Sequence, residues 1–142
     1  PLILMGGGTG FAPLKGIIEH ALHTQLERPM HLFWGARIRQ DLYLDELPQR
    51  WQNQHPLFRY TPVLSEPQAD DDWQGETGLV HEAIMRHYPD MSQFDVYMSG
   101  APAMVYTARD AFIECGNSDQ HLYSDAFEFN SQMVPPATQA NA

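Results

Sequence analysis

Short apolar runs alternate along the chain with longer stretches in which apolar residues recur every three or four positions. We predict strands at residues 2–5, 30–34, 58–64, 96–98 and 122–123. Between them we predict helices over residues 11 to about 26, 42 to about 51, 77 to about 88, and 103 to about 115. This alternation is typical of a parallel α/β sheet. Right-handed crossovers then predict a doubly wound, five-stranded parallel sheet in the order 3-2-1-4-5, with helices on both faces.

Several single residues indicate where these elements begin and end. Asp41 and Thr77 are predicted as the N-caps of the second and third helices, and Gly116 should close the fourth. The segment 65–75 reads as a loop. Periodicity is lost from Ser131 onward, which predicts a domain over residues 1–130 and a disordered tail over 131–142. Because the first apolar run begins at Pro1 without a methionine, we expect the chain to be a piece of a longer protein.

Two glycine-containing turns follow strands one and four of the predicted sheet. Gly6–Gly10 comes after the first strand, and Ser99–Gly100 comes after the fourth. In the predicted strand order these two strands flank the switch point, where ligands of open α/β sheets bind at the carboxyl ends of the strands. The sequence therefore predicts one ligand site that both turns share.

The first turn has the composition of a phosphate-binding loop. Glycines let backbone N–H groups approach a phosphate closely, and the start of a helix favours negative charge. A Walker loop is excluded because Phe11, and not lysine, follows Gly10. The GxGxxG spacing also fails, since it would need glycine at Phe11 or Pro13. A tight strand–helix turn without any ligand fits the same residues.

Four segments, in order, resemble the nucleotide-binding half of ferredoxin–NADP reductase-like enzymes. They are the turn Met5–Pro13, the segment Trp34–Arg37 with Asp41–Tyr43, the segment Tyr97–Met104, and the aromatic segment Ser124–Phe129. The resemblance extends from Pro1 to about Asn130. It is closest to the NADH-dependent reductases of oxygenases and of deoxysugar dehydration, and to NAD(P)H:flavin reductases. Two departures are Ser99, where many members have cysteine, and Ala101, which stands between the motif's glycine and proline.

The resemblance implies a role for particular residues. The pyrophosphate would be cradled by Gly7, Gly8, Thr9 and Gly10, with Pro13 fixing the start of the helix. Arg37 would lie at the adenosine ribose or its phosphate, and Tyr43 near the adenine. Ser99 and Gly100 would lie beneath the nicotinamide, in a turn shaped by Pro102 and Met104. Glu128 and Phe129 would lie near the flavin, so Ser99, Glu128 and Phe129 are the candidate catalytic residues.

The implied parent enzyme passes a hydride from NAD(P)H to FAD, and electrons onward to an iron–sulfur acceptor. NADH is the favoured nucleotide, although no ribose-binding carboxylate is evident after the second strand. No segment resembles the family's flavin-binding domain, which is expected upstream, so FAD would be bound mostly outside this chain. The expected partners are that domain and a two-iron ferredoxin domain or protein. An isolated nucleotide-binding module without catalytic turnover is the alternative.

The composition of the chain argues against several classes of function. The formal net charge is −10, which argues against nucleic-acid binding. No apolar run is long enough to span a bilayer, so no membrane association is expected, and a cytoplasmic location is the default. Cys115 is the only cysteine, which excludes an internal disulfide and a cysteine-ligated cluster built from this chain alone.

No metal site is predicted, although some residues partly match known metal-binding motifs. His81–Glu82 begins like the zinc motif HExxH, but Met85 stands where the second histidine should be. We interpret the histidines of the first and third helices as exposed, and Asp70–Asp72 as part of a solvated loop. Trp34 is predicted to be a packing residue. Arg37 also fits an ordinary surface cation.

Overall fold

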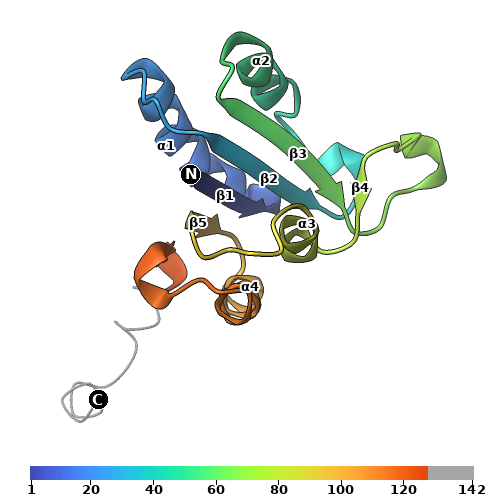
Figure 1. The fold of residues 1–142 in the computed structure, drawn as a ribbon. Coiled ribbons are helices and arrows are strands. Elements are labelled where there is room, and N and C mark those ends of the chain that lie inside the picture. Colours follow the sequence, from blue (N-terminus) through green and yellow to red (C-terminus); the bar gives the residue numbers. More distant parts are fainter. Residues whose placement is uncertain (128–142) are drawn as a thin grey trace.

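The computed structural model of the chain describes residues 1–127, and its core is a six-stranded sheet (Figure 1). Every neighbouring pair of strands is parallel, and the strand order is β4-β3-β2-β1-β5-β6. The strands are β1 (Leu2–Gly7), β2 (Met30–Ala36), β3 (Phe58–Leu64), β4 (Glu76–Thr77), β5 (Asp95–Ser99) and β6 (Leu122–Tyr123). The helices are α1 (Phe11–His23), α2 (Glu46–Gln54), α3 (Val80–His87) and α4 (Pro102–Glu114). The parallel α/β class and the relative order of the five expected strands are confirmed.

Two apolar layers hold the helices on opposite faces of the sheet. Leu2 and Leu4 of β1 pack in the layer that α1 and α2 cover, whereas Ile3 and Met5 pack in the layer that α3 and α4 cover. This alternation follows from the two-residue period of a strand. Because β1 is buried on both faces, its sequence is continuously apolar, as expected for a central parallel strand.

The prediction of five strands is wrong, because β4 adds a sixth at the edge of the sheet. Its two residues pair with the end of β3, Glu76 with Val63 and Thr77 with Leu64. Thr77 therefore lies in a strand and does not cap a helix. The helix α3 begins only after Gly78, whose φ of +101° turns the chain. A polar two-residue strand has no periodicity, so only its pairing with β3 reveals it.

The second helix also begins later than predicted. Asp41 ends a short 3₁₀ turn over Arg39–Asp41, and α2 starts at Glu46. Pro48 gives the physical reason. In a helix that began at Leu42, Pro48 would lie in the interior and clash with the carbonyl group four residues before it, whereas in α2 it occupies the first turn.

The other helix ends depart less from the prediction. The helix α1 stops at His23, three residues early, because Gln25 adopts a left-handed φ of +56°. The helix α4 begins one residue earlier than predicted and ends one residue earlier, with Gly116 following at a φ of +101°. The predicted tail, 131–142, lies outside the described residues. In the part of the chain that the structure describes, no helix is both long and apolar enough to cross a bilayer.

Candidate functional site

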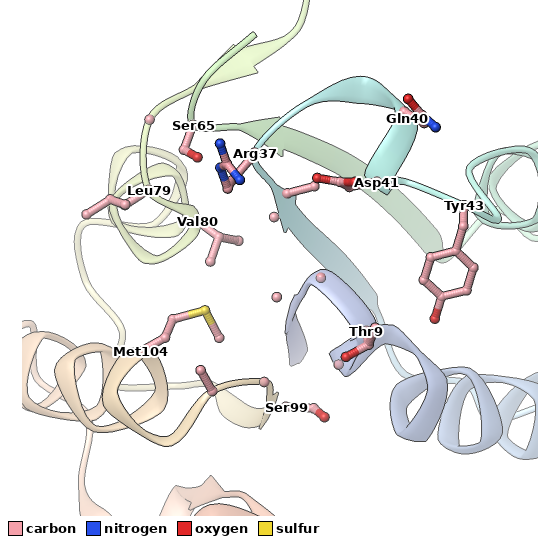
Figure 2. A pocket seen from close by; sticks show the side chains of 18 of the residues that line it. Thr9, Arg37, Gln40, Asp41, Tyr43, Ser65, Leu79, Val80, Ser99 and Met104 are labelled. Atoms are coloured by element: carbon pink, nitrogen blue, oxygen red, sulfur yellow. The ribbon is translucent and has the colours of Figure 1, made fainter.

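A pocket of about 880 Å³ opens at the carboxyl ends of the central strands (Figure 2). Its walls come from the turns that follow β1, β2 and β5, from Ser65 after β3, and from the start of α3. The lining residues include Gly7, Gly8, Thr9, Gly10, Arg37, Asp41, Tyr43, Ser99, Gly100 and Met104. The pocket therefore lies at the switch point between β1 and β5, where the sequence predicted a ligand.

The first wall is the glycine turn between β1 and α1. Gly8, Thr9 and Gly10 form one 3₁₀ turn, and α1 continues directly from it at Phe11. Gly8 has a φ of +55°, a left-handed conformation that glycine adopts without steric cost. Gly10 has an ordinary φ of −62°, so its lack of a side chain serves a different purpose. A Cβ on Gly10 would lie 2.6 Å from the carbonyl carbon of Ser99.

The second wall is the turn between β5 and α4. Ser99 ends β5, Gly100 follows with a φ of +147°, and Pro102 is the first residue of α4. The side chain of Met104 lies against both turns. A Cβ on Gly7 would lie 2.6 Å from the Met104 sulfur, and a Cβ on Gly100 would overlap the Met104 methyl group. The two glycine turns and Met104 thus form one continuous surface of the pocket.

Helix ends make the pocket favourable for an anion. The helices α1, α3 and α4 all begin at it, since Gly10, Leu79 and Ala101 at their N-caps are lining residues. No side-chain hydrogen bond caps any of the three. The first N–H groups of a helix lack partners within the helix, and the helix dipole adds partial positive charge there. The chain is acidic overall, but this part of its surface is suited to phosphate groups.

The far wall carries the larger polar side chains, which Figure 2 shows around the opening. Arg37 forms an ion pair with Glu66, with 3.1 Å between Nη2 and Oε2, and both side chains are more than half exposed. The loop after β2 is also held to the loop after β3 by Arg39, which donates to the main-chain oxygen of Asp71 at 2.8 Å. Tyr43 is 49% exposed at the opposite rim. The side chains around the opening therefore include a cation, a carboxylate at Asp41 and an aromatic ring.

A second, smaller hollow adjoins the first. It measures about 360 Å³ and shares Pro13 and Ser99 with the pocket. Its other walls include Ile17, Tyr123 and Phe127. Ser99 therefore stands between the pocket and this second hollow.

The structure gathers most of the predicted site residues in one place. All of the predicted site residues within residues 1–127 line the pocket except Pro102, which is the first residue of α4. Glu128 and Phe129 lie outside the described residues. No sequence pattern indicated Gln40, Ser65, Gly78, Leu79 and Val80, which also line the pocket. Gly35, Ala36, Asp41 and Ala101 line it too, and they lie in the segments that resemble the family but were given no role in the site. Gly35, Ala36 and Ser65 follow the same rule as the glycine turns, since they lie at the carboxyl ends of β2 and β3.

One prediction about the histidines is wrong. His81 lies on the first turn of α3 and is buried, with 8% of its surface exposed. Burial lowers the pKa of His81, and the nearby Glu82 opposes that effect. Within residues 1–127, no three His, Cys, Asp or Glu side chains are grouped so that they could hold a metal ion.

Comparison with known proteins gives consistent matches. The sequence profile of the oxidoreductase NAD-binding domain family matches residues 4–110. A CDP-6-deoxy-L-threo-D-glycero-4-hexulose-3-dehydrase reductase from Yersinia pestis is 39% identical over 89% of this chain and 38% of its own length. A probable flavin reductase from Photobacterium leiognathi is 34% identical over 91% of this chain and 55% of its own length.

A solved structure resembles this fold closely. A cytochrome P450 reductase from Amycolatopsis superposes with a TM-score of 0.80 at 33% identity, over 87% of this chain and 36% of that chain. This chain therefore spans more than a third of the length of the Yersinia and Amycolatopsis proteins and about half of the length of the Photobacterium protein.

Proposed function

This chain belongs to the oxidoreductase NAD-binding domain family, and from that we propose that its pocket binds NADH or NADPH for a flavin-dependent reductase. The observation that carries the proposal is the meeting of two glycine turns, Gly7–Gly10 and Ser99–Gly100, at one pocket lined by three uncapped helix ends. A dinucleotide needs such a surface for its pyrophosphate.

We assign the parts of the nucleotide along the pocket. Gly7, Gly8, Thr9 and Gly10 would hold the pyrophosphate. Among them, Gly10 lies so close to the main chain of Ser99 that a side chain would not fit there. Arg37 would contact the adenosine ribose or its phosphate, and Tyr43 would lie near the adenine. Ser99 and Gly100 would lie beneath the nicotinamide at the other end. The chemistry of the lining supports this assignment, because the glycine turns and helix starts offer backbone N–H groups to phosphates and Tyr43 offers an aromatic ring to the adenine.

The residues of this chain would act by positioning. When bound in the full-length protein, FAD would supply the redox chemistry by accepting the hydride. Ser99 would hold the nicotinamide at the boundary between the pocket and the second hollow, which we propose faces the flavin-binding domain. Holding two reactants in a fixed geometry lowers the entropic part of the barrier. Glu128 and Phe129 are proposed to complete this end of the site.

The domain arrangement is a further part of the proposal. We assign residues 1–130 to nucleotide binding and the flavin to another domain of the parent protein, since this chain matches only 38% of the Yersinia reductase. Electrons would leave the flavin for an iron–sulfur domain or protein. Because the chain matches only part of its relatives, a second candidate function is a module that binds the nucleotide without catalytic turnover.

Calorimetry and absorbance spectroscopy test the proposal on the chain itself. We expect NADH to bind to the purified chain with one site per molecule. If the chain also bleaches added FAD in the presence of NADH, it carries reductase activity alone, and the module without turnover is excluded. Binding without bleaching is expected of both candidates, because another domain would bind the flavin. Absence of binding to both NADH and NADPH would exclude both candidates.

A further inference from the structure

Trp34 connects the hydrophobic core to the glycine turn. It lies on β2 with none of its surface exposed, and it does not line the pocket. Its indole Nε1 donates a hydrogen bond to the carbonyl oxygen of Gly8, at 2.9 Å. Gly8 does line the pocket. One buried side chain therefore fixes the orientation of a peptide group in the proposed pyrophosphate site.

Aromatic contacts hold the indole in place. The ring of Phe11, the first residue of α1, stacks on Trp34 with centroids 4.1 Å apart and planes inclined by 12°. Tyr43, which lines the pocket, meets the indole edge-on with ring centroids 5.2 Å apart. The rotation of Trp34 is thus restricted by the residue that follows the turn and by the aromatic side chain at the far rim.

The hydrogen bond matters because a carbonyl oxygen and a phosphate repel each other. Gly8 has a φ of +55°, and glycine can adopt many other backbone conformations at little cost. Without a partner, the Gly8 carbonyl group could rotate toward the solvent-filled pocket, where it would present partial negative charge to an anion. The indole directs this oxygen into the core, which keeps the N–H side of the turn available to the ligand.

We propose that Trp34 is a positioning residue that preorganises the Gly8–Gly10 turn for the pyrophosphate of a dinucleotide. The inference rests on the proposed function, and it adds a residue to the site that no pocket contact would identify. Phosphate binding should therefore depend on the indole N–H, and not only on the volume of the ring.

The substitution Trp34→Phe tests this directly, because phenylalanine retains an aromatic ring but has no donor. We expect the Kd for ADP-ribose to rise about tenfold, which corresponds to about 1.4 kcal/mol. The Kd for adenosine, which has no phosphate, should change less than about twofold. The matched control is Trp51→Phe, since Trp51 lies in the same buried layer, 6.2 Å from Phe11 between ring centroids, and away from the pocket lining.

The results separate the inference from the proposed function. If wild type binds ADP-ribose and Trp34→Phe binds it equally well, the inference is wrong and the proposed function stands. If Trp34→Phe and Trp51→Phe weaken ADP-ribose and adenosine alike, Trp34 has only a packing role. If wild type binds neither ADP-ribose nor NADH, both the proposed function and the inference are wrong.

Nuclear magnetic resonance supplies a second readout that needs no folded Trp34 variant. In the wild-type ¹H–¹⁵N spectrum, ADP-ribose should shift the indole N–H signal of Trp34 and leave that of Trp51 in place. An unmoved Trp34 signal at saturating ADP-ribose would contradict the inference.

Discussion

The main chains of Gly10 and Ser99 touch across the switch point of the sheet. A Cβ on Gly10 would lie 2.6 Å from the Ser99 carbonyl carbon and would overlap its oxygen. These two residues belong to different strand–helix units, and their contact brings both glycine turns into a single pocket. The relationship makes Gly10 a structural requirement of the site as well as a place where a phosphate can approach.

The substitution Gly10→Ala is expected to destabilise the protein by about 1–3 kcal/mol, since the added methyl meets main chain that cannot rotate aside. The backbone at Gly10 has an ordinary helical φ, so the loss is steric and not conformational. Urea unfolding measures it.

Gly16 is the matched control within the same helix. A Cβ there meets no atom within 4 Å, so Gly16→Ala should stabilise α1 by about 0.5–1 kcal/mol. Equal stability of the Gly10→Ala variant and wild type would show that the two turns are not in contact.

The ion pair between Arg37 and Glu66 predicts a preference for NADH. Arg37 already faces a carboxylate at 3.1 Å, and the Glu66 charge would repel a 2′-phosphate. Glu66→Gln should therefore improve the affinity for NADPH relative to NADH about fivefold, since a charge near the surface contributes about 1 kcal/mol. Fluorescence titration with both nucleotides provides the measurement.

Glu19→Gln is the control for this effect, because Glu19 also pairs with an exposed cation, Lys15, but lies on α1 outside the pocket lining. It should leave the ratio of affinities unchanged. The preference for NADH would be refuted if Arg37→Ala weakened NADPH binding alone by about tenfold, or about 1.4 kcal/mol.

His31 predicts a loss of stability in weak acid. Its ring is buried on β2, stacks on Phe33 at 4.0 Å, and hydrogen-bonds to Tyr88 and Thr61 at 2.7 Å each. Burial, with smaller contributions from Arg59 and His87, lowers the pKa of His31 from 6.5 to about 3. Between these two values the unfolded chain binds a proton that the folded chain does not.

The free energy of unfolding should therefore fall as the pH drops from about 6 to about 4, by up to about 1.4 kcal/mol per pH unit from this residue. Urea unfolding at several pH values measures the slope, and His31→Gln should reduce it. Thr61→Val removes one hydrogen bond but retains the imidazole, so it should lower stability and keep the slope. A slope that is the same in His31→Gln and wild type would contradict the assignment.

The sequence alone determined the elements whose signals are local. The continuous apolar run of β1 and the glycines after it predicted a buried parallel strand and a phosphate-type turn, because strand period and glycine conformation depend on neighbouring residues. Ser99–Gly100 was placed at the same site by strand order alone. Right-handed connections leave few topologies, which is why the order of five strands could be predicted.

The remaining features depend on contacts between residues far apart in the sequence. No local pattern along the chain predicts these features. They are the pairing of Glu76 with Val63, the burial of His81, the start of α2 and the hydrogen bond from Trp34 to Gly8. From the sequence alone, a tryptophan in an apolar run is interpreted as a packing residue. The hydrogen-bond partner of its indole N–H depends on which chain segment lies opposite, and the sequence does not show that. The sequence therefore determined which turns form the site, and long-range packing decided how their peptide groups are held.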